Sequence, residues 1–122
     1  GSAVGVCSDA LNGNDFLTLS EISSALESVG LQKKLAFVGF DACLMANYET
    51  ARILAPFAEK MIASEELEPS GGWDWKKTLE NLSDPTEIAK GYAVKNAYTD
   101  YYTVSVIDLE KLKTFFRALS KR

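Results

Sequence analysis

The feature that most constrains the fold is a short apolar run, residues 35–40 (LAFVGF), followed directly by Asp41-Ala42-Cys43. The run has the length of a strand and does not alternate apolar with polar residues, a pattern typical of a strand buried on both faces. Such strands occur in open α/β sheets, where ligands bind outside the carboxyl ends of the strands. We therefore expect Asp41 and Cys43 to lie at the ligand-binding edge of a sheet.

The order of predicted elements indicates an α/β layered domain with a mainly parallel sheet. Strands are expected at 35–40, 60–64 and 103–107, and a loop is expected at 8–15. Helices are expected from the N-cap Ser20 to Gly30, from Leu44 to Glu59, and around Trp75, Leu79 and Leu82. Two more helices are expected: one within 83–98 that begins at the N-cap Asp84, with Pro85 and Glu87 in its first turn, and one after the N-cap Asp108, with Leu112, Phe115, Phe116 and Leu119 facing the core. Three strands are few for such a sheet. We therefore expect residues 1–122 to form a single domain or a fragment that lacks upstream strands.

Composition narrows the classes of partner. The chain has 122 residues, 47% of them hydrophobic, which is enough to bury a core. Thirteen Lys and Arg against seventeen Asp and Glu give a net charge of −4 without a block of either sign, which argues against a phosphate-binding surface. No apolar stretch approaches the roughly 18 to 20 residues of a membrane span. We expect neither nucleic acid nor a membrane as a partner.

Asp41 and Cys43 are the strongest candidates for chemistry. A thiol at a strand-to-helix turn lies near the positive end of a helix dipole, which favours the nucleophilic thiolate, and the helix start can offer N–H groups to an oxyanion. Asp41 can pair with a cationic side chain in a partly dry pocket. The alternatives are structural: Cys43 as a small buried hydrophobe and Asp41 as the N-cap of the following helix.

An acidic and aromatic loop follows the second predicted strand. Glu65, Glu66 and Glu68 can add negative potential to the Asp41 pocket, although a solvated acidic loop is the favoured interpretation of each one alone. Trp73 can form a wall for a peptide, or it can cover the core. From this loop we select Glu65, Glu66 and Trp73 as candidate substrate-binding residues.

The segment from Gly39 to Trp75, GFDACLMANYETARILAPFAEKMIASEELEPSGGWDW, resembles the signature segment of the clostripain family of cysteine peptidases, which have a caspase-like fold. LTLSEISSAL upstream and TVSVIDLEKLKTFFRAL at the close are also similar to family segments. The resemblance implies part of a three-layer α/β/α sandwich, the C-terminal part of a peptidase domain. It further implies an endopeptidase that cleaves after Arg or Lys through an acyl-enzyme, with Cys43 as nucleophile and Asp41 in the pocket that selects the cation.

One family feature is missing. Family peptidases pair the cysteine with a histidine, which acts as general base and acid, and these 122 residues contain none. In the family that histidine precedes a segment similar to VGVCSDALNGNDFLTLSEI. We therefore expect a missing N-terminal segment or a partner chain to supply it, and the isolated chain to be inactive. The alternative is a non-catalytic caspase-like scaffold or binding module.

Calcium and location depend on the resemblance alone. Some family members depend on calcium, and the family suggests a secreted or cell-envelope bacterial protein. Residues 12–21 have some ligand-like spacings, but Ala10 stands where the first acidic ligand of a calcium loop belongs and Asp15 where the turn needs Gly. No cofactor is therefore assigned, and a calcium site elsewhere stays open. Cys7 has no second ligand or base nearby, and we expect it to be structural.

Overall fold

A three-stranded sheet forms the middle layer of this computed structural model, which describes residues 5–69, 71–92 and 103–120. The strand order is β3 (Leu35–Gly39), β4 (Ala58–Ala63), β5 (Ser105–Asp108). β3 and β4 are parallel, whereas β5 runs antiparallel to β4. The α/β class is thus confirmed, with a mixed sheet in place of the mainly parallel one because β5 reverses direction.

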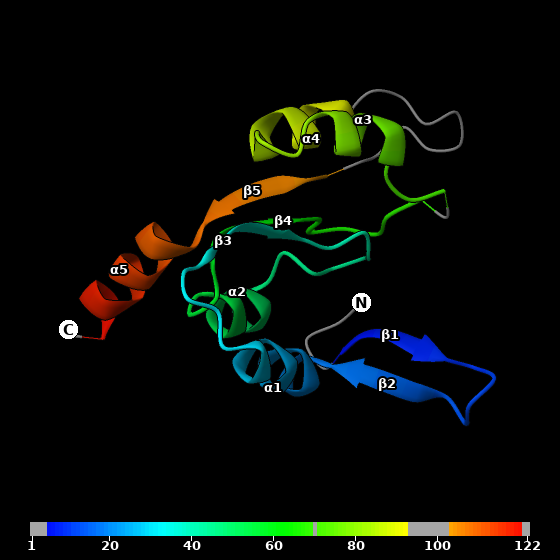
Figure 1. The fold of residues 1–122 in the computed structure, drawn as a ribbon, viewed down its shortest axis with the longest axis horizontal. Helices are drawn as coiled ribbons and strands as arrows, with labels where there is room; N and C mark the ends of the chain where they lie inside the picture. The colour runs from blue at the N-terminus through cyan, green and yellow to red at the C-terminus, as the bar shows by residue number, and fades with distance from the viewer. Residues whose placement is uncertain (1–4, 70, 93–102, 121–122) are drawn as a thin grey trace.

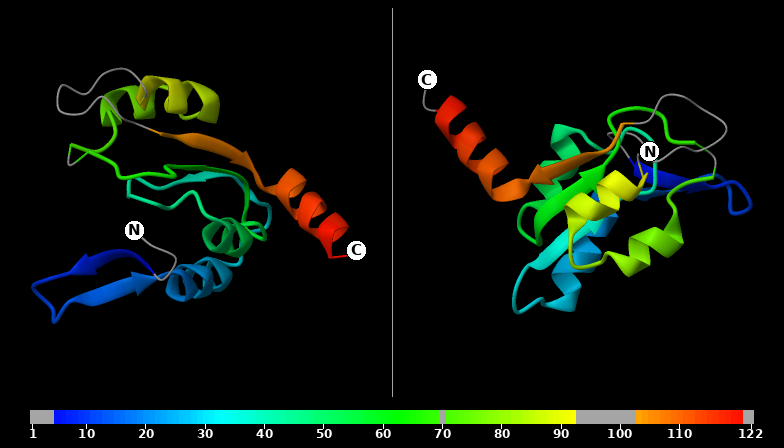
Figure 2. Two further views of the ribbon diagram at one scale, coloured as in Figure 1. Left: turned by 180° about the vertical axis from the view of Figure 1, so that it is seen from behind. Right: turned by 90° about the horizontal axis from the view of Figure 1, so that it is seen from above.

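Helices cover both faces of the sheet (Figure 1). α1 (Leu19–Val29) and α2 (Tyr48–Leu54) lie on one face, and α3 (Trp75–Glu80) and α4 (Pro85–Tyr92) lie on the other, as both views in Figure 2 also show. α5 (Leu109–Leu119) continues from the end of β5, packs against α2 and β4, and extends beyond the sheet. None of the helices in the described ranges is long and apolar enough to cross a bilayer.

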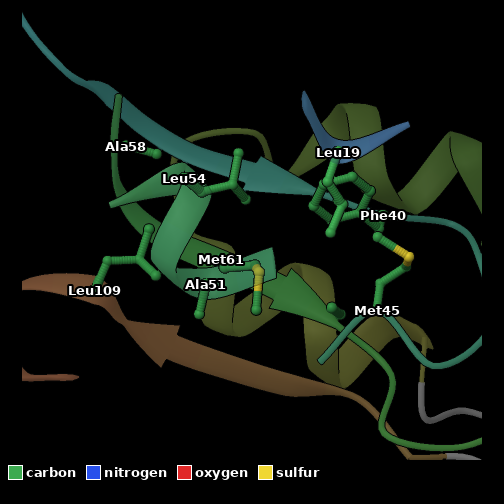
Figure 3. Packing of buried hydrophobic residues seen from close by; sticks show 9 residues of the cluster. Leu19, Phe40, Met45, Ala51, Leu54, Ala58, Met61 and Leu109 are labelled. Carbon is green, nitrogen blue, oxygen red and sulfur yellow. The ribbon is translucent and has the colours of Figure 1, made fainter. Parts of the chain in front are cut away.

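The central strand β4 separates two hydrophobic clusters. Met61 points into the larger cluster and Ile62 into the smaller one, and both side chains are fully buried. This alternation is the two-residue period of a strand. The larger cluster (Figure 3) contains Leu19, Phe40, Met45, Ala51, Leu54, Ala58, Met61, Ala63 and Leu109. The smaller contains Ile62, Trp73 and Ile88.

β3 is less buried than its apolar sequence predicts. Phe37 and Val38 are half-buried, and Ala36 and Gly39 are exposed. The reason is its position, since β3 forms one edge of the described sheet and has a neighbouring strand on one side only. An edge strand without charged residues is a template for another strand.

The N-terminal region contains a hairpin where we expected a loop. β1 (Gly5–Asp9) pairs antiparallel with β2 (Asp15–Thr18). The connection turns through Gly13 and Asn14, which have φ values of 77° and 58°, the residue types that accept this conformation most readily. The prediction of a loop over 8–15 was therefore wrong at both of its ends.

Two helix starts test the capping predictions. Thr18, and not Ser20, is the N-cap of α1, because Thr18 and Glu21 bond each other's backbone N–H groups in a capping box. The C-cap Gly30 has the left-handed conformation expected there, with φ 64°. Asp84 accepts the N–H of Thr86 at 2.8 Å at the start of α4, as predicted, and residues 93–98 of that predicted segment lie outside the described residues.

Candidate active site

The chain that leaves β3 does not enter a helix at once. The backbone N–H of Phe40 donates to the carbonyl of Ile62 at 3.0 Å, and that of Leu44 donates to the carbonyl of Glu66 at 3.0 Å. Ala46 N–H donates to Ser64 at 2.9 Å. Residues 40–46 are thus tied to the end of β4 and to the chain that follows it. The helix predicted from Leu44 to Glu59 is present only as α2, Tyr48–Leu54, so the prediction was wrong at both of its ends.

The helix begins four residues later because of its cap. Asn47 is the N-cap of α2, and its Oδ1 accepts the N–H of Thr50 at 2.9 Å while its Nδ2 donates to the carbonyl of Leu44 at 2.8 Å. α2 therefore starts at Tyr48. No helix therefore begins directly beside Cys43, and the alternative that Asp41 caps this helix is wrong, because Asn47 is the N-cap.

Leu44 lies in a strained conformation directly after the thiol. Its φ is 60°, a left-handed value that costs a non-glycine residue roughly 1–2 kcal/mol. Two hydrogen bonds hold it there: the N–H of Leu44 donates to the carbonyl of Glu66, and the carbonyl of Leu44 accepts the side-chain N–H of Asn47. Strain of this kind persists where the surrounding structure fixes it, and it is concentrated at functional sites.

The Cys43 thiol is held by one residue of the acidic loop. Cys43 is half-buried, and its Sγ accepts the backbone N–H of Glu68 at 3.1 Å. The same sulfur lies 3.8 Å from the carbonyl oxygen of Glu68, to which the thiol can donate. The position of the sulfur is therefore set by the backbone of the loop that follows β4.

Asp41 is fixed by the glycine-rich end of that loop. Both carboxylate oxygens of Asp41 accept the backbone N–H of Trp73 at 3.1 Å. Gly72 lies immediately against them with φ 62°, and a Cβ built on it would come within 2.5 Å of Asp41 Oδ2. A glycine is required at position 72 both for its backbone conformation and for this close approach.

Glu68 places a second carboxyl group beside Asp41. Its Oε1 accepts the indole N–H of Trp73 at 3.3 Å, whereas its Oε2 is buried without a donor among the described residues. Burial first, and the adjacent Asp41 carboxyl second, raise the pKa of Glu68 to about 7. The neutral form of Glu68 is favoured because it removes a buried charge and the repulsion between two neighbouring carboxylates.

These groups open into one cavity of about 340 Å³. Its lining residues are Asp41, Ala42, Cys43, Glu68, Pro69, Gly71 and Gly72. A thiol and two carboxyl groups thus share one site that is built from the end of β3 and the loop after β4. The chemistry it can perform is attack by sulfur on a substrate held through a cationic group.

The other sequence candidates lie outside the cavity. Glu65 is exposed and accepts the Ser105 hydroxyl at 3.0 Å, and Glu66 is exposed and contributes through its backbone. The Trp73 side chain is 5% exposed, packs in the smaller hydrophobic cluster and lies against Trp75, with ring centroids 5.9 Å apart. Trp73 reaches the site through its two N–H groups.

Sequence reasoning did not select Glu68 and Gly72. Glu68 was indistinguishable from the other two acids of its loop, because only the fold shows which side chain turns inward. A Gly pair directly before a tryptophan was the available signal for Gly72, since adjacent glycines indicate unusual backbone or a close contact.

Metal and disulfide chemistry find no support in the described residues. No group of three or more His, Cys, Asp or Glu side chains there could hold a metal ion. Cys7 and Cys43 are both free, and Cys7 is exposed on β1. We expected Cys7 to be structural, but its side chain is not buried in the core.

Similar structures share this fold. They include a clostripain from Bacteroides thetaiotaomicron ATCC 29148 in complex with the peptide inhibitor BTN-VLTK-AOMK (TM-score 0.74, 21% identity, 86% of this chain and 48% of that chain). A B. fragilis cysteine protease gives a TM-score of 0.71 at 21% identity, over 84% of this chain and 48% of the other. A secreted C11 cysteine protease from B. thetaiotaomicron, "iotapain", gives 0.73 at 21% identity, over 85% and 31%.

Sequence comparison agrees with the fold. The comparison with curated proteins gave no match. The chain spans about half or less of the solved proteases described above. The model of the clostripain family matches residues 2–121, nearly the whole chain. This chain therefore belongs to the clostripain family of cysteine peptidases and has their caspase-like fold.

Proposed function

We propose that this chain is the nucleophile-bearing part of a cysteine endopeptidase that cleaves peptide bonds after Lys or Arg. The observation that carries the proposal is the cavity shared by the Cys43 thiol and the Asp41 carboxylate. A Lys or Arg side chain paired with Asp41 would bring the adjacent carbonyl carbon toward the sulfur. The inhibitor bound to the B. thetaiotaomicron clostripain is a peptide, which is consistent with a peptide substrate here.

The proposed reaction proceeds through a thioester. A general base removes the thiol proton, the sulfur attacks the carbonyl carbon, and the C–N bond breaks as the leaving amine takes up a proton. Water then hydrolyses the thioester. The backbone N–H of Cys43, which donates to no acceptor within the part of the chain that the structure describes, is the proposed oxyanion donor.

The general base has to come from elsewhere. The 122 residues contain no histidine, and a segment upstream in the whole protein or a partner chain is the proposed source. The exposed edge of β3 is where additional strands would pair. On this proposal the isolated chain has little or no turnover. The whole protein is proposed to be secreted, as iotapain from B. thetaiotaomicron is.

The test is hydrolysis of reporter peptides ending in Arg, Lys or Leu by the product of the gene's complete reading frame. We expect cleavage after Arg and Lys that disappears in Cys43→Ala and persists in the matched variant Cys7→Ala. Absence of cleavage by the well-folded complete protein would favour the scaffold or binding-module reading.

Asp41 is tested separately by labelling in a Cys7→Ser background, so that Cys43 is the sole thiol. A thiol-reactive peptidyl ketone ending in Lys should label Cys43 faster than one ending in Leu. Asp41→Asn should remove this preference for Lys, while alkylation of Cys43 by iodoacetamide should be unchanged. Glu66→Gln, outside the cavity, should retain the preference for Lys. A Lys preference that survives Asp41→Asn would remove Asp41 from the substrate pocket.

A further inference from the structure

A second and larger cavity lies between α2 and α5. It is a groove of about 620 Å³ and shares no residue with the Asp41–Cys43 cavity. Its apolar floor includes Ala51 and Leu109, which are 1% and 0% exposed. Tyr48 and Phe116 form an aromatic pair at one wall, with ring centroids 4.3 Å apart.

The apolar face of α5 is not fully covered by the core. The sequence predicts that Phe115, Phe116 and Leu119 are core residues, but Phe115 is 57% and Leu119 47% exposed. The prediction fails because α5 runs beyond the end of the sheet (Figures 1 and 2). An apolar surface of this kind, beside a hollow, marks an interaction site.

The charges on the groove have one sign. Arg52, Lys113 and Arg117 line it, and no acidic residue does. None of these three cations forms an ion pair with any described residue, although Lys34, Lys77, Lys90 and Lys111 elsewhere all do. The chain as a whole is acidic, with a net charge of −4. An occupant that pairs with the groove must therefore combine an apolar face with acidic flanks.

We propose that the α2–α5 groove binds an amphipathic helical segment of a partner protein that has acidic residues on both flanks of its apolar face. A groove receives a helix through apolar side chains at i, i+3, i+4 and i+7. The eleven residues of α5 match a partner helix of about three turns. A bilayer is a poorer match, because the buried Ala51 and Leu109 lie at the bottom of a hollow that a flat surface cannot reach.

The experiment uses the 122-residue chain and a fluorescent helical peptide of about 16 residues, with Leu on one face and Glu on both flanks. A second peptide carries Lys in place of every Glu. Fluorescence anisotropy should show binding of the Glu peptide only. Arg117→Glu should weaken it about tenfold or more, while Lys76→Glu on α3, remote from the groove, should leave it unchanged. Circular dichroism verifies that each variant is folded.

Reversal of all three groove charges supplies the decisive arm. The variant Arg52→Glu, Lys113→Glu, Arg117→Glu should lose the Glu peptide and bind the Lys peptide. Equal binding of both peptides to the wild type, or no binding of the Glu peptide at about 1 mM, would overturn the proposal. Binding to anionic vesicles that Arg117→Glu abolishes would assign the groove to a membrane, and dimerisation that Arg117→Glu abolishes would assign it to a second copy. None of these readouts depends on peptidase activity.

Discussion

The carboxyl groups of Asp41 and Glu68 lie side by side at the cavity of the Cys43 thiol, and their oxygens are satisfied unequally. Both Asp41 oxygens accept the N–H of Trp73, whereas Glu68 Oε2 is buried without a donor among the described residues. Two adjacent carboxylates repel each other, so Glu68 keeps its proton to a higher pH than an isolated glutamate does. The charge of the cavity therefore depends on pH.

Glu68 should make folding stability depend on pH. Its pKa is raised from 4.5 to about 7 in the folded chain, so between these values the folded state holds a proton that the unfolded state has lost. The stabilisation is present in full below pH 4.5 and is lost as pH rises through about 7. Urea unfolding at about pH 5 and about pH 8, on either side of the raised pKa, should show this loss in the wild type.

Glu68→Gln removes the titrating group and keeps an amide donor that can reach Asp41. The wild-type loss of stability with rising pH should therefore be smaller in Glu68→Gln. Glu66→Gln, an exposed acid of the same loop, is the matched control and should behave as the wild type does. Identical pH slopes for Glu68→Gln and wild type would show that the proton is not held at Glu68.

Cation selectivity should follow the same titration. When Glu68 loses its proton the cavity gains a second negative charge, and attraction for a Lys side chain increases. In the Cys7→Ser background, the ratio of Cys43 labelling by the Lys and Leu peptidyl ketones should rise as pH increases through about 7. Taking the ratio cancels the pH dependence of the thiol itself. A ratio that rises equally in Glu68→Gln would contradict this role.

Gly72→Ala should disturb both stability and the pocket. Alanine at φ 62° is strained, and its Cβ would come within 2.5 Å of Asp41. Gly13→Ala is the matched control, because Gly13 also has a positive φ, 77°, with no atom within 4 Å of the added Cβ. We expect Gly13→Ala to lower the free energy of unfolding by about 1 kcal/mol and Gly72→Ala by at least about 1 kcal/mol more. If chemical unfolding shows equal decreases in the free energy of unfolding for the two variants, the Asp41 side chain moves away from the added Cβ at no energetic cost.

The start of α1 offers a test of capping. Thr18→Ala removes the side chain that accepts the Glu21 N–H at 3.2 Å, and we expect it to lower the free energy of unfolding by about 1 kcal/mol. Ser20→Ala removes only a hydroxyl that contacts Thr18 Oγ1 at 3.0 Å and should cost clearly less. Thermal unfolding of the two variants gives the comparison, and a larger loss in Ser20→Ala would reverse the assignment of the cap.

Several elements could be predicted because their signals are local. Asp108 bonds the N–H of Lys111 at 3.0 Å as the cap of α5, and Gly30 ends α1. The strand predicted at 60–64 is observed as β4, Ala58–Ala63, and its last three residues are buried. Each of these features depends on backbone conformation or on residues within one turn of each other.

The start of α2 could not be predicted in the same way. The apolar spacing after Leu44 is compatible with a helix, but Leu44 and Ala46 donate to Glu66 and Ser64, about twenty residues away in the chain. Long-range hydrogen bonds of this kind override local propensity. The burial of Phe115 failed for a related reason, since an amphipathic pattern reveals an apolar face and not whether anything covers it.

The sequence by itself determined the α/β class, the family, and the pair Asp41 and Cys43 at the end of β3, because hydrophobic periodicity and a short motif are properties of neighbouring residues. Tertiary structure alone decided which acid joins that pair. Glu68 turns inward because its backbone binds the Cys43 sulfur and its side chain meets the Trp73 indole, whereas Glu65 and Glu66 remain at the surface. Contacts between segments about twenty-five residues apart are set by packing, which no local pattern of the sequence specifies.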